Sequence, residues 1–219
     1  MENWTQDIIK ALEDRTASDT KKNIYDSEFF KSHLKYKPIY DFIGDLIITY
    51  FEPKSVIDFG CGCGFLLERL WRHGVEEVCG IEGSEEVREF WVNEFPMILY
   101  NKFVVGNILD YAVDRRYDIV ICMEVAEHLK PEHSDKLVDI ICNSSSKSVW
   151  FTAAVPGQGG TGHINCRDIC YWISLFEEHG FEADWELIYK IKQTMLQNHA
   201  ICLGYPWFRD NLCVFRKVG

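Results

Sequence analysis

The sequence predicts an α/β fold, in which a mostly parallel sheet is covered by helices on both faces. Two observations lead to this prediction. From residue 55 onward, short apolar runs of strand length alternate with amphipathic stretches of helix length, and such alternation is typical of parallel strands joined by helices. A glycine-rich turn also follows the first apolar run directly, at the place where open α/β sheets bind their ligands.

The chain before residue 53 is expected to be helical. Apolar residues recur at helical spacing over 3–14 and over 37–51, where Pro38 suits a first turn, and an aromatic and charged stretch lies between them. We interpret 1–52 as an N-terminal helical cap and 53–219 as the core. Because 219 residues with 47% apolar composition fill one core but hardly two, we predict a single domain over 1–219.

The core elements are predicted in chain order. Strands are expected within 55–59, 76–82, 102–107, 117–125 and 148–155, and helices within 65–73, 84–95, 131–142 and 167–180. Ser84 before two glutamates fits an N-cap, Pro131 fits a first-turn proline, and Gly180 fits a helix stop. The runs 181–191 and 211–218 are both predicted to be strands, with no helix between them, paired antiparallel at one edge of the sheet.

Composition and charge argue against several functions. The 23 basic and 34 acidic residues give a net charge of −11, which repels a phosphate backbone, so nucleic acid is disfavoured as a partner. The first residues are acidic and polar rather than basic and then apolar, and Asp41 and Asp45 interrupt the most apolar helical stretch. We therefore expect a cytoplasmic protein without a membrane segment, and the sequence leaves its oligomeric state open.

Nine cysteines are present, but the number is odd and no C-x-x-C pair occurs, which argues against a disulfide framework or a zinc finger. Most of the cysteines in apolar runs are interpreted as small buried side chains of a protein in a reducing compartment. Cys61 and Cys63 differ because they lie in the glycine turn, where a short side chain does not crowd the backbone.

The glycine turn carries the first functional signal. Asp58 ends the first strand, and Gly60, Gly62 and Gly64 follow at alternate positions, so that the backbone can approach a ligand closely. Glu82 ends the next strand twenty residues after Gly62, where a carboxylate can accept hydrogen bonds from ribose hydroxyls. The G-x-G-x-G spacing departs from the dinucleotide pattern, and Asp58 suits the ammonium group of an amino acid better than a pyrophosphate.

Five segments together resemble the class I S-adenosylmethionine-dependent methyltransferases. They are VIDFGCGCG, IEGS, VVGNILD, YDIVICMEVAEHL and the closing HGF, in this order over residues 54–190. The resemblance implies a Rossmann-like fold, with a seven-stranded, mostly parallel sheet and an antiparallel last strand. It also implies S-adenosyl-L-methionine as cofactor, with the three glycines at its methionine end beside Asp58 and with Glu82 at its ribose.

The same resemblance extends to the next two strands. It implies that Asn107 lies near the adenine amino group and Ile108 beside the adenine ring, while Glu124 lies at the border between cofactor and substrate. Asn107 stands where many relatives have an aspartate. The amide is uncharged, but its oxygen can still accept a hydrogen bond from the amino group.

Two segments near the predicted strand ends offer groups for catalysis. Methyl transfer is an in-line displacement that depends on alignment in a water-poor pocket, and a hydroxyl acceptor must also lose its proton. His163, in the glycine-rich loop after the fifth strand, is our preferred general base, with a surface position lacking any role as the alternative. Glu124 and His128 would then serve as hydrogen-bonding groups.

A metal site is a competing interpretation of the same residues. The E-x-x-E-H run formed by Glu124, Glu127 and His128 is similar to that of ubiquinone-pathway O-methyltransferases and of small-RNA 2′-O-methyltransferases. With His163 as a later ligand, two carboxylates and two imidazoles suit manganese, iron, cobalt or zinc better than magnesium. We favour a metal-free site over this divalent-metal alternative.

Aromatic residues of two further segments are candidates for covering the ligands. Tyr25, Phe29 and Phe30 resemble the N-terminal caps of small-molecule methyltransferases and are expected either to close over the cofactor as a lid or to pack against the first long helix. In the loop before the last strand, the candidates for a substrate wall are Tyr205, Trp207, Phe208 and Arg209.

The preferred function is therefore S-adenosylmethionine-dependent methylation of a hydroxyl, or secondarily an amine, of a small molecule or sugar. The alternatives are a metal-dependent RNA 3′-end 2′-O-methyltransferase, a non-catalytic S-adenosylmethionine-binding partner subunit, and a nicotinamide-dependent dehydrogenase. The remaining histidines are interpreted as surface residues; they are His33, His73, His133, His179 and His199.

Overall fold

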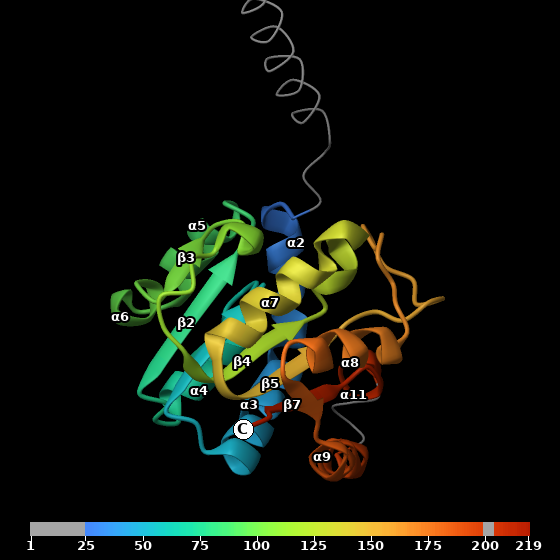
Figure 1. The fold of residues 1–219 in the computed structure, drawn as a ribbon. Helices are drawn as coiled ribbons and strands as arrows, with labels where there is room; N and C mark the ends of the chain where they lie inside the picture. The colour runs from blue at the N-terminus through green and yellow to red at the C-terminus, as the bar shows by residue number, and fades with distance from the viewer. Residues whose placement is uncertain (1–24, 199–203) are drawn as a thin grey trace, which may run out of the picture.

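A computed structural model describes residues 25–198 and 204–219, and its strands form one sheet (Figure 1). The strand order is β3-β2-β1-β4-β5-β7-β6. The strands are β1 Ser55–Phe59, β2 Glu77–Glu82, β3 Phe103–Val105, β4 Tyr117–Met123, β5 Ser145–Thr152, β6 Phe181–Ala183 and β7 Cys213–Lys217. Strand β7 alone runs in the direction opposite to the other six strands, which confirms the predicted seven-stranded, mostly parallel sheet.

Helices cover both faces of the sheet. The longer ones are α3 Lys37–Phe51, α4 Phe65–Arg72, α5 Val87–Glu94, α7 Ser134–Ser144, α8 Ile169–Glu178 and α9 Trp185–Gln197. The shorter ones are α2 Ser27–Ser32, α6 Met97–Tyr100, α11 Trp207–Asp210 and the 3₁₀ turns η1 His33–Tyr36, η2 Ile108–Asp110, η3 Ala126–His128 and η4 Pro131–His133. Helices α3, α4 and α9 lie on one face of the sheet, and α7 and α8 lie on the other (Figure 1). Their buried side chains belong to two separate core clusters, one on each face.

Strand β4 shows why the central strands are apolar throughout. Ile119 and Ile121 belong to the core on one face, whereas the alternate residues Val120 and Cys122 belong to the core on the other. A strand buried on both sides needs apolar residues at every position rather than at every second one. This pattern fixes β4 in the middle of the sheet, with β1 and β5 as its neighbours.

The described part of the N-terminal cap is helical, as predicted. Asp26 caps α2 by accepting a 2.9 Å hydrogen bond from the backbone N–H of Phe29. In α3 the fully buried Ile39, Ile43 and Ile47 recur every four residues, so this helix packs on the sheet through one stripe. The predicted helix over 3–14 lies outside the described residues.

The prediction that 181–191 forms one strand is wrong. The prediction that no helix lies between this strand and the last one is also wrong. Strand β6 ends at Ala183, and Asp184 then caps α9 by accepting a 3.0 Å hydrogen bond from Leu187 N. Ile188 and Ile191 are buried at the i, i+3 spacing of a helix. The predicted antiparallel edge pairing of the two strands, β6 with β7, is confirmed.

Two smaller findings complete the fold. Ser84 is not an N-cap, because α5 begins at Val87 and the Ser84 hydroxyl donates instead to Tyr25 O at 2.8 Å and to Glu86 Oε2 at 2.7 Å. Within the described ranges, none of the helices combines the length and the apolar character that a bilayer crossing requires.

Candidate functional site

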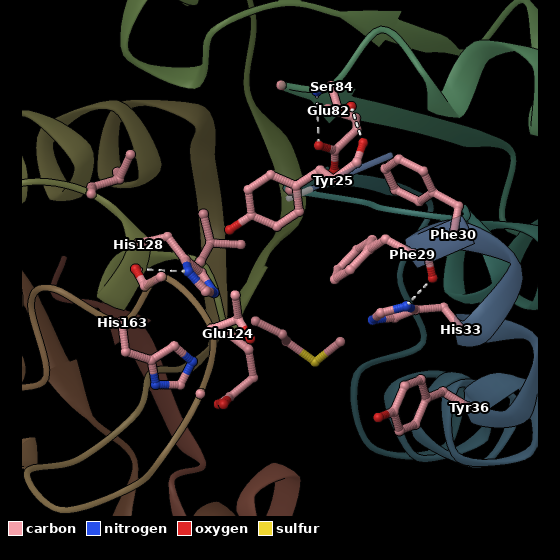
Figure 2. Close-up of a pocket in the computed structure, with 18 of the residues that line it drawn as sticks. Tyr25, Phe29, Phe30, His33, Tyr36, Glu82, Ser84, Glu124, His128 and His163 are labelled. Atoms are coloured by element: carbon pink, nitrogen blue, oxygen red, sulfur yellow. Dashed lines mark hydrogen bonds between the residues drawn. The ribbon is translucent and has the colours of Figure 1, made fainter. Parts of the chain in front are cut away.

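A large cavity opens at the carboxyl ends of β1, β2 and β4. Its volume is about 990 Å³, at the upper end of the range of about 300–1,000 Å³ typical of ligand pockets. Figure 2 shows Phe29, His33 and Tyr36 on one side of it and Glu124, His128 and His163 on the opposite side. Glu82 and Ser84 form a third part of the lining.

The glycine turn has the backbone that its sequence predicts. Gly60 and Gly64 have φ values of +80° and +76°, a region that residues with a Cβ rarely adopt. A Cβ on Gly60 would also come within 2.3 Å of Val125 Cγ2, and one on Gly64 within 2.8 Å of Phe103 Cζ. Of the three glycines, Gly60 lines the cavity formed by the described residues, whereas Gly62 and Gly64 do not.

Glu82 ties the second strand to the glycine turn. Its Oε2 accepts a 2.9 Å hydrogen bond from Gly62 N, and its Oε1 accepts a 3.1 Å bond from Ser84 N. Burial raises the pKa of Glu82, and these backbone donors oppose that shift. Each carboxylate oxygen keeps a further lone pair for a ligand hydroxyl.

Asp58 lies at the end of β1 beneath the turn and is 4% exposed. Burial, reinforced by the charge of Glu82, raises the pKa of Asp58 to about 8. The carboxyl group is therefore largely protonated near neutral pH when no cation is beside it. Asp58 is not among the residues that line the cavity.

The residues predicted as a lid reach both the glycine turn and the cavity. Cys63 Sγ donates a 3.4 Å hydrogen bond to Phe30 O, and Phe30 is 2% exposed. The Ser84 hydroxyl holds Tyr25 by its carbonyl group, and the Tyr25 ring lies edge-on to His128 at 5.9 Å between centroids. The segment thus spans the cavity from β2 to the predicted catalytic loop.

The aromatic wall is a set of three rings that line the cavity, Phe29, His33 and Tyr36, and Tyr205 packs against its end. The ring centroids of Phe29 and His33 are 4.0 Å apart, those of His33 and Tyr36 are 4.9 Å apart, and those of Tyr36 and Tyr205 are 4.8 Å apart. The prediction of His33 as a surface residue is wrong. It lines the cavity, its Nδ1 donates to Phe29 O at 2.7 Å, and burial lowers its pKa.

Only some of the candidates for a substrate wall in the loop before β7 line the cavity. Trp207 and Phe208 line the cavity, and Tyr205 contacts the ring of Trp207 at 5.7 Å between centroids. Arg209 does not line the cavity and pairs with Asp210 at 2.6 Å. The structure therefore brings the predicted lid and the predicted substrate wall together but leaves the arginine outside.

Glu124 is held by two neutral amides at the end of β4. Asn211 Nδ2 donates to Glu124 Oε1 at 3.3 Å, and Gln158 Nε2 donates to Glu124 Oε2 at 3.1 Å. Asn211 Nδ2 also donates to Gln158 Oε1 at 2.9 Å. The backbone of Glu124 has a φ of +54°, a strained conformation for a residue with a side chain and one found most often at functional sites.

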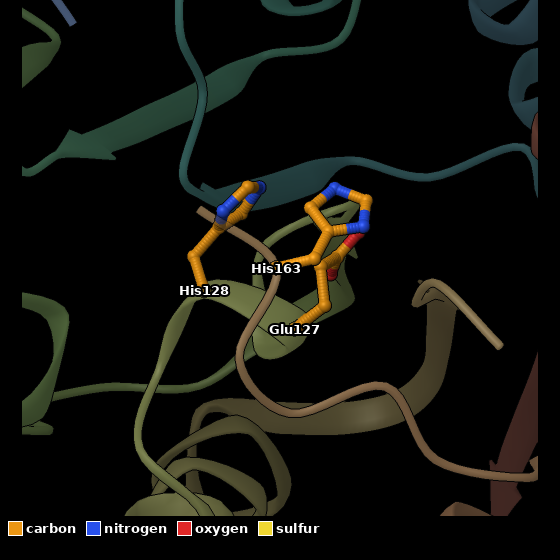
Figure 3. A group of neighbouring side chains, drawn as sticks. All are labelled: Glu127, His128 and His163. Carbon is orange, nitrogen blue, oxygen red and sulfur yellow. The ribbon is translucent and has the colours of Figure 1, made fainter. Parts of the chain in front are cut away.

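Glu127, His128 and His163 form a compact cluster. Each offers one ligand atom, and these atoms lie within 4.8 Å of one another; Figure 3 shows the three side chains projecting in the same direction. The two imidazole rings have centroids 4.9 Å apart. Three of the four predicted metal ligands therefore converge, while the fourth, Glu124, is engaged by its two amides.

The loop after β5 is fixed against this cluster. Ile164 N and Asn165 N both donate to Glu127 O, at 2.8 and 3.0 Å. The buried Asn165 side chain also donates to Ala126 O at 3.3 Å. An ideal Cβ on Gly160 would lie 2.1 Å from Nε2 of His163, so the imidazole ring rests directly over this glycine.

The ionisation of the cluster follows from its burial. Since a carbonyl oxygen only accepts, the 3.3 Å contact between His128 Nδ1 and Gly162 O requires the proton on Nδ1. Burial and the neighbouring His163 lower the pKa of His128, so its Nε2 carries a free lone pair near neutral pH. Burial and the charge of Glu124 raise the pKa of Glu127.

The donor set of this cluster fits a divalent transition metal. Glu127 is fully buried, and within the described residues neither of its carboxylate oxygens forms a hydrogen bond of normal geometry. A buried carboxylate without donors is costly unless it is protonated or binds a cation. One carboxylate with two imidazoles is a ligand set suited to manganese, iron, cobalt or zinc.

The predicted adenine contacts both line the cavity, but Asn107 is already engaged. Its Oδ1 accepts a 3.1 Å hydrogen bond from Leu109 N, and its Nδ2 donates to Asp110 Oδ2 at 3.0 Å. Asn107 thereby caps η2. Ile108 is buried at the start of the same turn.

Sequence reasoning missed several side chains of the site. His33 and Tyr36 follow the predicted lid residue Phe29 at i+4 and i+7, and helical spacing alone would have put them on the same face as Phe29. Gln158 is the polar residue between two glycines in the loop after β5, and Asn211 immediately precedes the last strand. The sequence shows both as polar residues near strand ends, but only the folded structure shows that they contact Glu124.

A seven-stranded sheet with β7 antiparallel between β5 and β6, with a cavity at a glycine turn after β1, defines a class I methyltransferase fold. Residues 30–187 match the family model described as a methyltransferase domain. The chain belongs to this methyltransferase family, which confirms the resemblance to class I S-adenosylmethionine-dependent enzymes.

The chain is similar to several known proteins. It is 28% identical over 139 residues to a ubiquinone biosynthesis O-methyltransferase of Alkalilimnicola ehrlichii, an alignment that covers 54% of this chain and 55% of the relative. The chain spans about half the length of the curated relatives it matches.

Two solved structures share the fold. One is a SAM-dependent methyltransferase from Archaeoglobus fulgidus, with a TM-score of 0.61 and 18% identity over 86% of this chain and 99% of that one. The other is an O-methyltransferase of a Brevibacillus brevis polyketide synthase in complex with S-adenosyl-L-homocysteine, with a TM-score of 0.58 and 16% identity over 81% of this chain and 72% of that one.

Proposed function

We propose that this protein transfers a methyl group from S-adenosyl-L-methionine to a hydroxyl group of a small molecule. The observation that carries the proposal is a single cavity of about 990 Å³ that contacts the glycine turn, Glu82 and the imidazoles of His128 and His163. This volume accommodates a nucleoside cofactor together with an acceptor. Family membership over residues 30–187 supports the same reaction type.

The cofactor is assigned to the part of the cavity between the glycine turn and β2. Glu82 would accept hydrogen bonds from the ribose hydroxyls with its remaining lone pairs. The methionine end would lie along Gly60, with its ammonium group near Asp58. Asn107 and Ile108 would meet the adenine, and the amide of Asn107 would use the lone pair that Leu109 N leaves free.

The acceptor is assigned to the space between the aromatic wall and the histidines. His163 is the proposed general base, because it lies on a loop pinned to Glu127 and lines the cavity. His128, neutral and with Nε2 unprotonated, stands beside it as a second acceptor for the hydroxyl proton. Alignment of donor and acceptor in a cavity shielded by Tyr25 and Phe29 would supply much of the remaining rate enhancement.

The buried Glu127 carboxylate supports a second way of activating the hydroxyl. Glu127, His128 and His163 would hold a divalent ion, which lowers the pKa of a bound hydroxyl when present. Elemental analysis of protein purified without chelator tests this site. Stoichiometric metal that is lost in Glu127→Gln supports it, whereas metal-free protein with chelator-resistant turnover refutes it.

The composition of the cavity favours a small-molecule acceptor over RNA. None of the described residues that line it is a lysine or an arginine, although phosphate groups are normally bound by such side chains. We also propose a cytoplasmic location, because the eight cysteines of the described residues are all free, as is usual in a reducing compartment.

A screen with radiolabelled cofactor tests the enzymatic proposal. Hydroxyl-bearing and amine-bearing acceptors are offered with the wild-type protein and with His163→Ala. We expect methyl transfer to at least one hydroxyl acceptor, with loss of turnover but unchanged S-adenosylhomocysteine affinity in the variant, and weakened affinity in Asp58→Ala and Glu82→Ala. Tight cofactor binding without transfer to any acceptor would instead indicate a non-catalytic partner subunit.

A further inference from the structure

The walls of the cavity carry acidic groups and aromatic rings. The described residues that line the cavity include four carboxylates and no lysine or arginine; the carboxylates are Glu82, Glu85, Glu86 and Glu124. Glu82 is bonded to the glycine turn, Glu85 pairs with Arg88, and Glu86 accepts a 2.7 Å hydrogen bond from the Ser84 hydroxyl. Glu124 therefore needs a separate explanation, because it lies across the cavity beside His163 (Figure 2).

Two uncharged amides hold the carboxylate of Glu124 in place. Both of its oxygens accept hydrogen bonds from uncharged amides, at 3.1 Å from Gln158 and 3.3 Å from Asn211. No ion pair of Glu124 occurs among the described residues. Its carboxylate lines the cavity, and the buried carboxyl group of Glu127 is its acidic neighbour.

The opposite wall favours a flat and cationic ligand. Phe29, His33 and Tyr36 stand in ring contact along α2 and η1 and face Glu124 across the cavity (Figure 2). Aromatic faces attract ammonium groups. Lys35, which is exposed and does not line the cavity, demonstrates this here, with its ammonium group 4.9 Å from the centroid of Tyr36.

Resting on the proposed function, we propose that the acceptor is a hydroxyl-bearing aromatic amine that binds as its cation. Its ring lies against the wall of Phe29, His33 and Tyr36, its protonated amine faces the carboxylate of Glu124, and its hydroxyl reaches His163. An acceptor with a carboxylate or phosphate in place of the amine should bind more weakly, because it would meet Glu124 where the described lining residues include no lysine or arginine to balance it.

The carboxylates also have a competing explanation, which is that they only serve the positive sulfonium group of the cofactor. The two explanations differ when the cofactor site holds S-adenosylhomocysteine, which lacks the sulfonium charge. If Glu124 serves the cofactor alone, the charge of the acceptor then has no effect on its affinity. If Glu124 selects the acceptor, the preference for a cation persists.

The test is calorimetric titration of protein saturated with S-adenosylhomocysteine, using acceptors that differ only in charge. On a catechol frame these are dopamine, ethylcatechol and dihydroxyphenylacetate; on a phenol frame they are tyramine, ethylphenol and hydroxyphenylacetate. We expect the amine to bind most tightly and the carboxylate most weakly, with at least about a tenfold difference between them. In Glu124→Gln the difference should fall below about threefold.

A matched control and the refuting outcomes complete the experiment. Glu182→Gln removes the same charge from β6, where the carboxylate pairs with Arg216. This control should leave the order of acceptor affinities, amine before carboxylate, unchanged. Equal affinities, a preference for the carboxylate, no binding by either amine, or a preference that survives Glu124→Gln would each overturn the proposal. Failure of the proposed function is seen separately, because the protein is first titrated with S-adenosylhomocysteine alone and would then show no binding.

Discussion

Replacing Gly160 by alanine is expected to disable the site by displacing His163 while leaving the fold intact. The ring of His163 rests over Gly160, and an ideal Cβ there would lie 2.1 Å from Nε2, 2.2 Å from Cε1 and 2.6 Å from Cδ2. Real Cβ atoms essentially never approach other atoms within 3.0 Å. Because the backbone of Gly160 does not have positive φ, alanine itself fits the chain, and the ring must move.

The size of the effect follows from this displacement. The imidazole has to shift by at least about 1 Å, and a misplacement of that size is associated with losses of about a hundredfold in rate. The strain is relieved by swinging one side chain at the cavity surface, so the melting temperature should stay within about 2 °C of wild type or rise slightly, since Gly→Ala also reduces the entropy of the unfolded chain.

Steady-state methyl transfer to the best acceptor of the screen measures kcat/KM, and calorimetry measures S-adenosylhomocysteine affinity. Gly159→Ala is the matched control, since a Cβ there meets no atom within 4 Å. We expect about a hundredfold loss for Gly160→Ala and less than a twofold change for Gly159→Ala, with cofactor affinity unchanged in both. Near-normal turnover in Gly160→Ala, or equal losses in the two variants, would refute the role given to His163.

Three further predictions test the cofactor-binding part of the cavity and the amide that supports Glu124. The pKa of Asp58 is raised to about 8, so a cofactor ammonium group that binds beside it at pH 7 should release up to about one proton from its carboxyl group. Calorimetry in buffers of different ionisation enthalpy measures this proton release, and an equal release in Asp58→Asn contradicts the placement. Glu82→Gln should weaken S-adenosylhomocysteine binding by at least about tenfold, whereas Glu85→Gln, on an exposed ion pair, should not. Gln158→Leu removes the donor to Glu124 Oε2 and should lower kcat by about tenfold without changing cofactor affinity; an unchanged kcat would show that the amide has no positioning role.

The sheet was predictable because its signals are local. A strand buried on both faces is apolar at each position, and a turn that needs positive φ uses glycine, so β1, β4 and the turn at Gly60 and Gly64 can be recognised from the residues alone. Strand β6 and α9 were not separated, because the N-cap Asp184 looked like one more polar residue in an alternating run. Helical spacing of Ile188 and Ile191 was the signal that distinguishes them.

The catalytic side of the cavity was predictable only in part. His163 and the E-x-x-E-H run lie at predicted strand ends, so their neighbourhood follows from a parallel sheet. Their supports depend on long-range contacts that no local pattern encodes: Asn211 lies 87 residues from Glu124 along the chain, and the seating of His163 over Gly160 depends on how Ile164 and Asn165 bond to Glu127.

The attachment of the N-terminal segment has a kinetic consequence. Two neighbouring residues of α2 make different contacts. Phe30 O accepts a hydrogen bond from the thiol of Cys63 in the glycine turn, while the ring of Phe29 contacts that of His33 in the aromatic wall. A movement of this helix that admits or releases the nucleoside must also reshape the surface offered to the second reactant. Turnover should therefore follow a compulsory order with the nucleoside entering first and leaving last, and the demethylated product should compete with the methyl donor alone.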